Sequence, residues 1–401
     1  MTAAALAVFV LAGPGTGAAA TPPVSSQAKA EAIVAPSVVY VTTKWRGWIR
    51  LTNGRLLSHY PFYVNTTCSG FVASPDGYVV TAGHCVDDRT ADGGKGLLIK
   101  EALAELVHAG RLTLKEAQAL LQHAYMNWTV EGTQSGSPPD RAIAVYQARA
   151  ASGVPVSEPM QASVLSFSSL RTGDVALLKV ASPAPMPMLA VAPQSPDNGT
   201  EVVSAGYPGS VAKVTDPRLL PSFKEGSTSS TQTVNGVPFI EVSAAASPGM
   251  SGGPTVNLDG QVVGTVSFGV GGESQPFNFI TDTSTVRALL VRNGVPTTLS
   301  AADQAFRAGL TDYYAGHYHD AVAEFDKVLA VQPSQATAQQ YRARAVQNYP
   351  NEVSGTSPWL WVGTGAGALV LIAVVIVAAL MIRRSRTRRS PPGAAPPPPG
   401  A

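Results

Sequence analysis

Short runs of β-branched and aromatic residues, separated by Gly, Pro, Asn and Asp, dominate residues 30–295 of this chain. A run of this length between turn-forming residues is typical of a β-strand rather than of a helix. Many such strands at close spacing indicate a β-sandwich or a β-barrel. The clearest runs are SVVYVTT, GFVAS, GYVVTA, DVALLKV, EVVSAGY, PFIEVSA and QVVGTVSFG.

One segment inside this β-rich region has a different pattern. Between residues 96 and 128 the apolar residues recur at helical spacing, and Thr113 with Glu116 forms a plausible capping box for the second half. We therefore expect an inserted helical hairpin there. Residues 131–162 are rich in Gly, Ser, Pro and Ala, which predicts a surface loop.

A second helical segment is expected over residues 300–347, where small and aromatic residues alternate at the spacing of a helix pair. It resembles a tetratricopeptide repeat (TPR). Such repeats usually need about three copies to bury a core. A helical stalk packed on the β-body is therefore favoured over a peptide-binding groove, although a protein partner for this segment stays open. The matching positions are Ala305, Gly309, Tyr313, Gly316, Tyr318, Ala321, Phe325 and Pro333.

Both ends of the chain suggest targeting segments. Residues 1–20 form a short apolar run followed by small residues, which is typical of a secretory signal peptide. Residues 359–382 carry no charge and, as a helix, would extend roughly 36 Å, enough to cross a bilayer. A basic, Pro-rich tail follows at 383–401, so the positive-inside rule places it in the cytoplasm. The expectation is a single-pass protein of the cell membrane whose main body faces outward.

Composition excludes several other classes of protein. Charged residues make up 13% of the chain and the net charge is +2, which gives no argument for nucleic-acid binding. The chain has two cysteines, too few for a disulfide-rich scaffold or the common cysteine-rich zinc modules. They still permit one structural bridge.

A candidate nucleophile lies in SPGMSGGP, where Ser251 stands among glycines. This pattern fits either a tight turn or a hydroxyl presented to a substrate. A serine becomes a strong nucleophile when a base takes its proton and a third group orients that base. Of six histidines, His84 in GYVVTAGHCV ends a strand-like run, and Asp174 in RTGDVALLKV directly precedes another.

The blocks TAGHC, GDVALLKV and GMSGGP together resemble the three active-site blocks of trypsin-like serine proteases, in that family's chain order of His, Asp and Ser. The HtrA/DegP-like bacterial secreted branch resembles the chain most, over residues 35–292. The resemblance implies a mainly β protein of two six-stranded antiparallel barrels, the chymotrypsin fold. The hairpin at 96–128, the C-terminal TPR-like helices and one transmembrane helix complete the expected fold.

The resemblance also implies roles for individual residues. His84, Asp174 and Ser251 would be the catalytic triad, and the backbone N–H groups of Gly249 and Ser251 would form the oxyanion hole. Cys68 and Cys85 would form a disulfide, as is common at these positions. No metal or organic cofactor is implied. The specificity pocket would be lined by Ala245, Ala246, Phe268 and Gly269.

We therefore expect a membrane-anchored serine endopeptidase that hydrolyses proteins or peptides. None of the four pocket residues is acidic, so cleavage after a small or medium apolar residue is expected rather than after Lys or Arg. The alternative is a catalytically silent scaffold that binds a protein partner through the hairpin or the TPR-like segment. The hairpin lies between His84 and Asp174 in the sequence, and it either gates the cleft or offers a partner surface.

Overall fold

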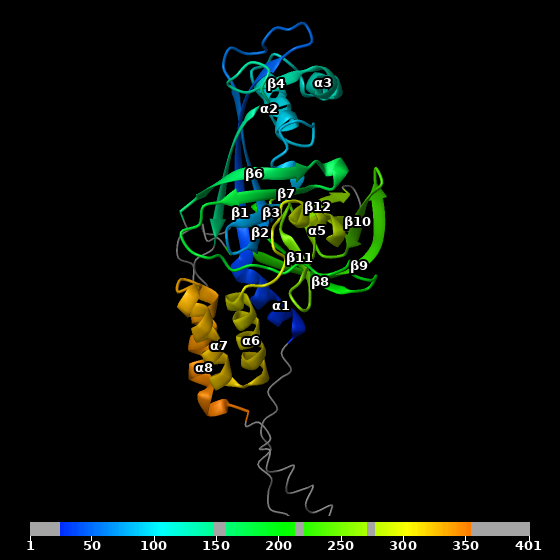
Figure 1. Ribbon diagram of the computed structural model, residues 1–401. Coiled ribbons are helices and arrows are strands. Elements are labelled where there is room, and N and C mark those ends of the chain that lie inside the picture. Colours follow the sequence, from blue (N-terminus) through cyan, green and yellow to red (C-terminus); the bar gives the residue numbers. More distant parts are fainter. Residues whose placement is uncertain (1–24, 148–157, 213–219, 271–276, 354–401) are drawn as a thin grey trace, which may run out of the picture. The chain divides into compact units, whose positions relative to one another are not determined.

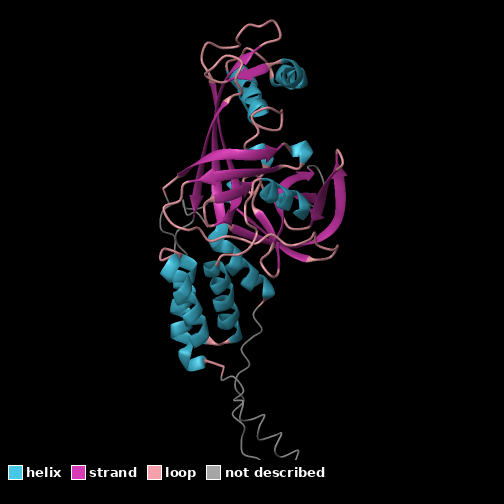
Figure 2. Ribbon diagram, in the orientation of Figure 1, coloured by secondary structure: helices cyan, strands magenta, loops and turns pink. Residues whose placement is uncertain are grey.

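The computed structural model describes residues 25–147, 158–212, 220–270 and 277–353. The chain divides into two compact units, residues 1–350 and 351–401, and the elements described below belong to the first. The predicted signal peptide (1–20), transmembrane helix (359–382) and tail (383–401) lie outside the described residues. Figure 1 shows the arrangement of the elements, and Figure 2 separates strands from helices.

The first half of the chain forms a β-barrel. Six antiparallel strands close a ring because β1 pairs with both β2 and β5, and β4 extends the far end of β1. Alternate residues of these strands, such as Val39 and Val41, point inward and are fully buried. The strands are β1 (Val38–Arg50), β2 (Phe62–Ser74), β3 (Tyr78–Thr81), β4 (Thr129–Glu131), β5 (Asp140–Gln147), β6 (Met160–Ser168) and β7 (Val175–Val180).

The second half forms a closed six-stranded barrel in the order β10, β13, β12, β11, β8, β9. Asn235 and Gly236 join β9 to β10, and both have positive φ angles, as a two-residue hairpin turn requires. The two predicted six-stranded barrels are thus confirmed. The strands are β8 (Glu201–Gly206), β9 (Ser222–Val234), β10 (Val237–Val242), β11 (Pro254–Asn257), β12 (Val262–Val270) and β13 (Phe277–Thr281).

The inserted segment folds into two helices, α2 (Gly94–His108) and α3 (Leu114–Asn127). The predicted capping box is confirmed, since the Thr113 hydroxyl accepts from the Glu116 amide and the Glu116 carboxylate accepts from the Thr113 amide. The hairpin has its own apolar cluster with the far part of β1, including Trp45. The prediction of a loop over 131–162 is wrong, because half of the described residues of that range belong to β5 and β6.

The remaining helices lie around the barrels. Three of them, α6 (Ala301–Ala315), α7 (Tyr318–Val331) and α8 (Ala336–Asn348), form the C-terminal helical segment. Phe325 is fully buried at the centre of this segment, and Gly309 leaves room for its ring. The other helices are α1 (Ser26–Val34), α4 (Gly209–Ala212) and α5 (Thr283–Arg292), and α1 packs against α6.

The predicted fold class is corrected on one point, since no transmembrane helix is found in the part of the chain that the structure describes. Within the described residues, no helix has both the length and the apolar character needed to cross a membrane. The longest of these helices, α2 and α6, contain 15 residues each. At ~1.5 Å per residue they reach about 22 Å, less than the ~30 Å hydrocarbon core of a bilayer.

Candidate active site

His84 and Asp174 meet at the first barrel. His84 lies in a 3₁₀ turn, Gly83–Cys85, directly after β3, and Asp174 immediately precedes β7, which pairs with β3. The His84 Nδ1 atom is 3.0 Å from each carboxylate oxygen of Asp174. The backbone N–H of His84 also donates to Asp174 Oδ1, at 2.9 Å. Because a carboxylate only accepts hydrogen bonds, Nδ1 carries the proton and Nε2 is left to act as a base.

Asp174 is buried and has an uncommon backbone conformation. It is fully buried, and its φ of 47° lies in the left-handed region, which Asp tolerates better than most residues. The hydroxyl of Ser267, which lies within β12, donates to Asp174 Oδ2. Ser267 therefore brings the second barrel into contact with the His–Asp pair. The sequence analysis missed Ser267, although it directly precedes the predicted pocket residues Phe268 and Gly269.

The two groups favour each other's charged forms. Burial alone would lower the pKa of His84, but the charge and hydrogen bond of Asp174 outweigh it and raise that pKa above its ordinary 6.5. Burial likewise opposes ionisation of Asp174, yet His84 and the Ser267 hydroxyl together lower its pKa. The pair is thus arranged to stabilise an imidazolium beside a carboxylate.

Ser251 lies against the same turn, in the loop between β10 and β11. Its carbonyl oxygen accepts from the Ser69 amide at 2.8 Å and is 4.0 Å from the Sγ of Cys85, the neighbour of His84. Gly252 follows with a φ of +81°, and a Cβ there would collide with the backbone nitrogen of Ala82. Glycine is therefore required for the loop to approach the histidine turn so closely.

The loop also orients its amides. Gly249 has a φ of +99°, and the carbonyl of Pro248 accepts from the Gly209 amide at 2.9 Å. The carbonyl of Met250 accepts from the Gly253 amide at 2.9 Å. In a trans peptide the N–H points opposite to the C=O, so these two bonds fix the directions of the Gly249 and Ser251 N–H groups. No described residue accepts a hydrogen bond from either N–H group.

The predicted pocket residues lie on two neighbouring segments of the second barrel. Ala245 and Gly269 are exposed, while Ala246 and Phe268 are partly buried. Phe268 stacks on Phe279 with ring centres 4.9 Å apart. Asn278, which the sequence analysis did not single out, joins the two segments. Its Nδ2 donates to the Ala244 carbonyl at 2.9 Å, and its Oδ1 lies against Gly269.

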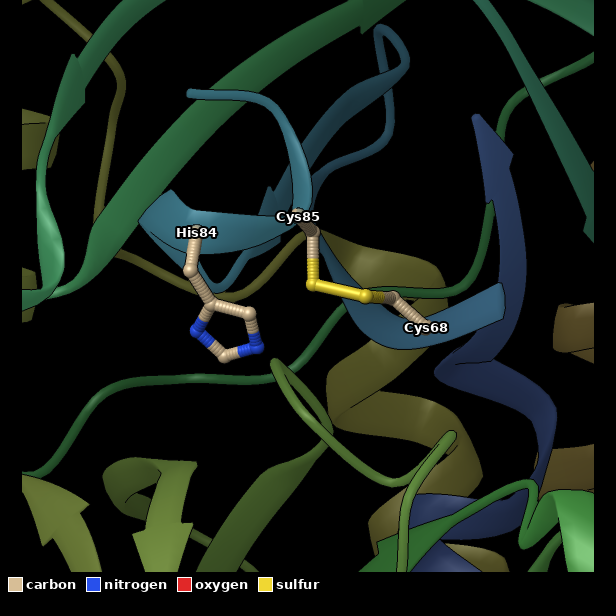
Figure 3. A group of neighbouring side chains, drawn as sticks. All are labelled: Cys68, His84 and Cys85. Atoms are coloured by element: carbon tan, nitrogen blue, oxygen red, sulfur yellow. A yellow bond between two sulfur atoms is a disulfide. The ribbon is translucent and has the colours of Figure 1, made fainter. Parts of the chain in front are cut away.

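A disulfide joins Cys68 to Cys85, and Figure 3 shows it beside the His84 side chain. The ligand atoms of Cys68, His84 and Cys85 lie within 4.8 Å of one another, a spacing that would suit a metal ion. The two sulfur atoms are bonded to each other, however, and metal binding requires thiolates. The bridge closes a loop between β2 and the His84 turn, which steadies the backbone on which the imidazole is mounted.

Comparison with known proteins gives one family match. Residues 68–264 match the family model described as the trypsin-like peptidase domain, and this range contains His84, Asp174 and Ser251. No curated protein matches the chain significantly. The matched range ends before α6, so the TPR-like character of the C-terminal helices stays a prediction, as does membership of the HtrA/DegP-like branch. From β2 of the first barrel to β12 of the second, the chain is therefore similar to the trypsin-like peptidase domain.

Proposed function

We propose that this protein is a serine endopeptidase in which Ser251 is the nucleophile, His84 the base and Asp174 the group that orients the base. The observation that carries the proposal is the His84–Asp174 pair on one barrel, with the glycine-rich loop of Ser251 packed against the same turn. The trypsin-like domain match over this region supports it.

In the proposed reaction Ser251 Oγ attacks the carbonyl carbon of the scissile peptide bond, and its proton passes to His84 Nε2. The oxygen becomes an oxyanion that accepts from the N–H groups of Gly249 and Ser251. His84 then protonates the leaving amine, which leaves an acyl group on Ser251. Water, deprotonated by His84, attacks the acyl carbon and releases the acid. His84 passes the proton that it took from water to Ser251 Oγ as the acyl bond breaks, which restores the free enzyme.

The protein substrate is proposed to place a small or medium apolar side chain between the segments that carry Ala246 and Phe268. Neither these residues nor Ala245 and Gly269 supplies a negative charge for Lys or Arg. We also propose that the domain works in an oxidising compartment, because a bridge such as Cys68–Cys85 persists there and is rare in reducing cytosol.

Labelling with a fluorophosphonate tests this function, since the reagent reacts with an activated serine. The purified protein is expected to be labelled, and Ser251→Ala and His84→Ala are each expected to abolish labelling while the circular dichroism spectrum is retained. Ser229→Ala is the matched control and should label normally, because Ser229 is an exposed serine on β9 whose hydroxyl donates to the Glu241 carbonyl. Absence of labelling in folded wild-type protein would instead favour a silent scaffold.

A further inference from the structure

Ser69 of β2 makes two hydrogen bonds to the loop that carries Ser251. It is fully buried and lies directly after Cys68. Its backbone N–H donates to the Ser251 carbonyl at 2.8 Å, and its hydroxyl donates to the Gly249 carbonyl at 2.8 Å. One residue of the first barrel thus holds the carbonyls of both residues whose N–H groups form the proposed oxyanion hole.

The Ser69 hydroxyl is itself oriented by the second barrel. The backbone N–H of Tyr207, at the end of β8, donates to Ser69 Oγ at 2.8 Å. Since this bond uses one lone pair of Oγ, the hydroxyl proton is directed at the Gly249 carbonyl. On the other side, the Thr81 hydroxyl donates to the Ser69 carbonyl at 2.7 Å, so the residue is fixed at its N–H, carbonyl and hydroxyl.

These bonds restrict the segment in which the oxyanion hole is built. The Gly249 carbonyl belongs to the peptide group that follows the Gly249 N–H, and the Ser251 carbonyl belongs to the group that follows the Ser251 N–H. Gly249 is a glycine with a positive φ, so few steric barriers restrain rotation about its bonds. A hydrogen bond on its carbonyl is then one of the few restraints that can hold the N–H in place.

We infer that Ser69 is a positioning residue for the oxyanion hole: it acts through the Gly249 and Ser251 carbonyls and does not touch substrate. The inference rests on the proposed function. Without the Ser69 hydroxyl, the buried Gly249 carbonyl loses its donor and the buried Tyr207 N–H loses its acceptor. The N–H groups of Gly249 and Ser251, which would bind the developing oxyanion, then lose their alignment. The effect belongs to the transition state rather than to substrate binding.

The test compares wild-type protein with Ser69→Ala, and uses Ser74→Ala as the matched control. Ser74 is also a buried serine on the same strand, and its hydroxyl accepts a local hydrogen bond from the Asp76 amide. The rate constant for fluorophosphonate labelling and kcat on a fluorescently quenched casein are each expected to fall roughly 10- to 100-fold in Ser69→Ala, with KM changed less than about threefold. Ser74→Ala should label at the wild-type rate.

Two further readouts separate positioning from a general loss of structure. The apparent pKa of His84 in the pH profile should be unchanged in Ser69→Ala, because the hydroxyl contacts the loop and not the imidazole. Ser69→Thr, which keeps a hydroxyl, should label within about threefold of wild type. If Ser69→Ala does not fold, Ser69→Gly carries the same test, since it also lacks the hydroxyl.

Labelling of a folded Ser69→Ala or Ser69→Gly protein at the wild-type rate would overturn the inference and leave the proposed function intact. A Ser69→Thr protein that is folded but as slow as Ser69→Ala would overturn it as well, because the hydroxyl would not be the determinant. Wild-type protein that is folded and unlabelled would overturn both the inference and the proposed function.

Discussion

The coupling of His84 to Asp174 has a direct consequence for the pH dependence of the proposed reaction. The base must be neutral to accept a proton from Ser251, and the net effect of burial and Asp174 is a pKa above the ordinary 6.5. We therefore expect kcat/KM to rise with pH and to reach half of its plateau above pH 6.5. Stopped assays at constant ionic strength from pH 5 to 9 measure this midpoint, and a midpoint below 6.5 would contradict the expected balance.

Ser267 should contribute to the same pair. Its hydroxyl lowers the pKa of Asp174, so the Ser267→Ala variant should raise that pKa and weaken the orientation of the imidazole. A hydrogen bond to a charged group stabilises by about 1.5–3 kcal/mol, which predicts a loss of roughly tenfold or more in kcat/KM. Ser243→Ala, at an exposed serine on the same barrel, is a suitable control. Equal kinetics for wild type and Ser267→Ala would exclude this role.

The sign of the stability effect follows from the direction of the shift. Asp174 has a lowered pKa in the folded protein, so its contribution to stability is present above the unfolded value and is lost as the pH falls through the folded value. His84 has a raised pKa, so its contribution is present below 6.5 and is lost as the pH rises through its folded value. The ion pair therefore stabilises the fold most at mildly acidic pH, below the pH range in which the enzyme is expected to be most active.

Among the site residues, those with an unusual sequence pattern around them could be predicted. Ser251 is marked by its glycines, and His84 and Asp174 are marked by the strands beside them. Ser69, Ser267 and Asn278 could not be found in this way. A serine or an asparagine in a strand is common, and these three gain their roles through contacts between segments far apart in the chain.

Among the elements, the strands with apolar runs were predictable and the strands with mixed composition were not. β5 reads DRAIAVYQ, and β6 reads MQASVLSFS with alternate residues only partly buried. The Gly, Ser and Pro residues around them suggested a loop. Their conformation depends instead on pairing, since β5 lies between β1 and β6 and completes the ring. Strand pairing of this kind is tertiary and has little local signal.

The inserted hairpin, by contrast, has strong local signals, and its cap offers a test. Thr113→Ala removes the hydroxyl that accepts from the Glu116 amide, which should destabilise α3 by about 0.5–2 kcal/mol. Hydrogen exchange should show faster opening of the first turn of α3, with amides of the second barrel unchanged. Ser135→Ala, in the exposed turn after β4, is the control. Faster exchange throughout the chain would mean that the hairpin is not an independent unit.

In the first compact unit the C-terminal helices share one apolar core with the barrels. This core runs from Phe71 and Leu177 in the first barrel, through Val256 in the second, to Phe306 and Phe325 in the helices. Polar contacts reinforce it where Arg307 of α6 donates to the carbonyls of Asp259 and Gly260. These contacts agree with the prediction of a helical stalk packed on the β-body. A peptide-binding groove that stands apart from the barrels would not need them. We therefore expect the barrels and these helices to unfold together.

Asp303 tests that expectation at the junction itself. It is 4% exposed, and its Oδ1 accepts from the backbone N–H of Met188, which follows the first barrel. Burial raises its pKa above 3.8, so its ionised form is favoured less in the folded protein than in the unfolded chain, and its contribution to stability declines as the pH rises through the folded value. A neutral side chain that keeps the acceptor should therefore be tolerated at pH 7.

Asp303→Ala is expected to lower the free energy of unfolding by about 1–3 kcal/mol, because the buried Met188 amide loses its acceptor. Asp303→Asn keeps an oxygen at that place and should cost less than about 1 kcal/mol. Urea denaturation at pH 7, followed by tryptophan fluorescence and by circular dichroism, measures both. Coincident transitions would support a shared core, since the five tryptophans are absent from α6, α7 and α8 while the circular dichroism signal is dominated by helices. An equal loss of unfolding free energy in both variants would show that Asp303 acts through its charge at the start of α6. Two separate transitions would show that the helices fold apart from the barrels.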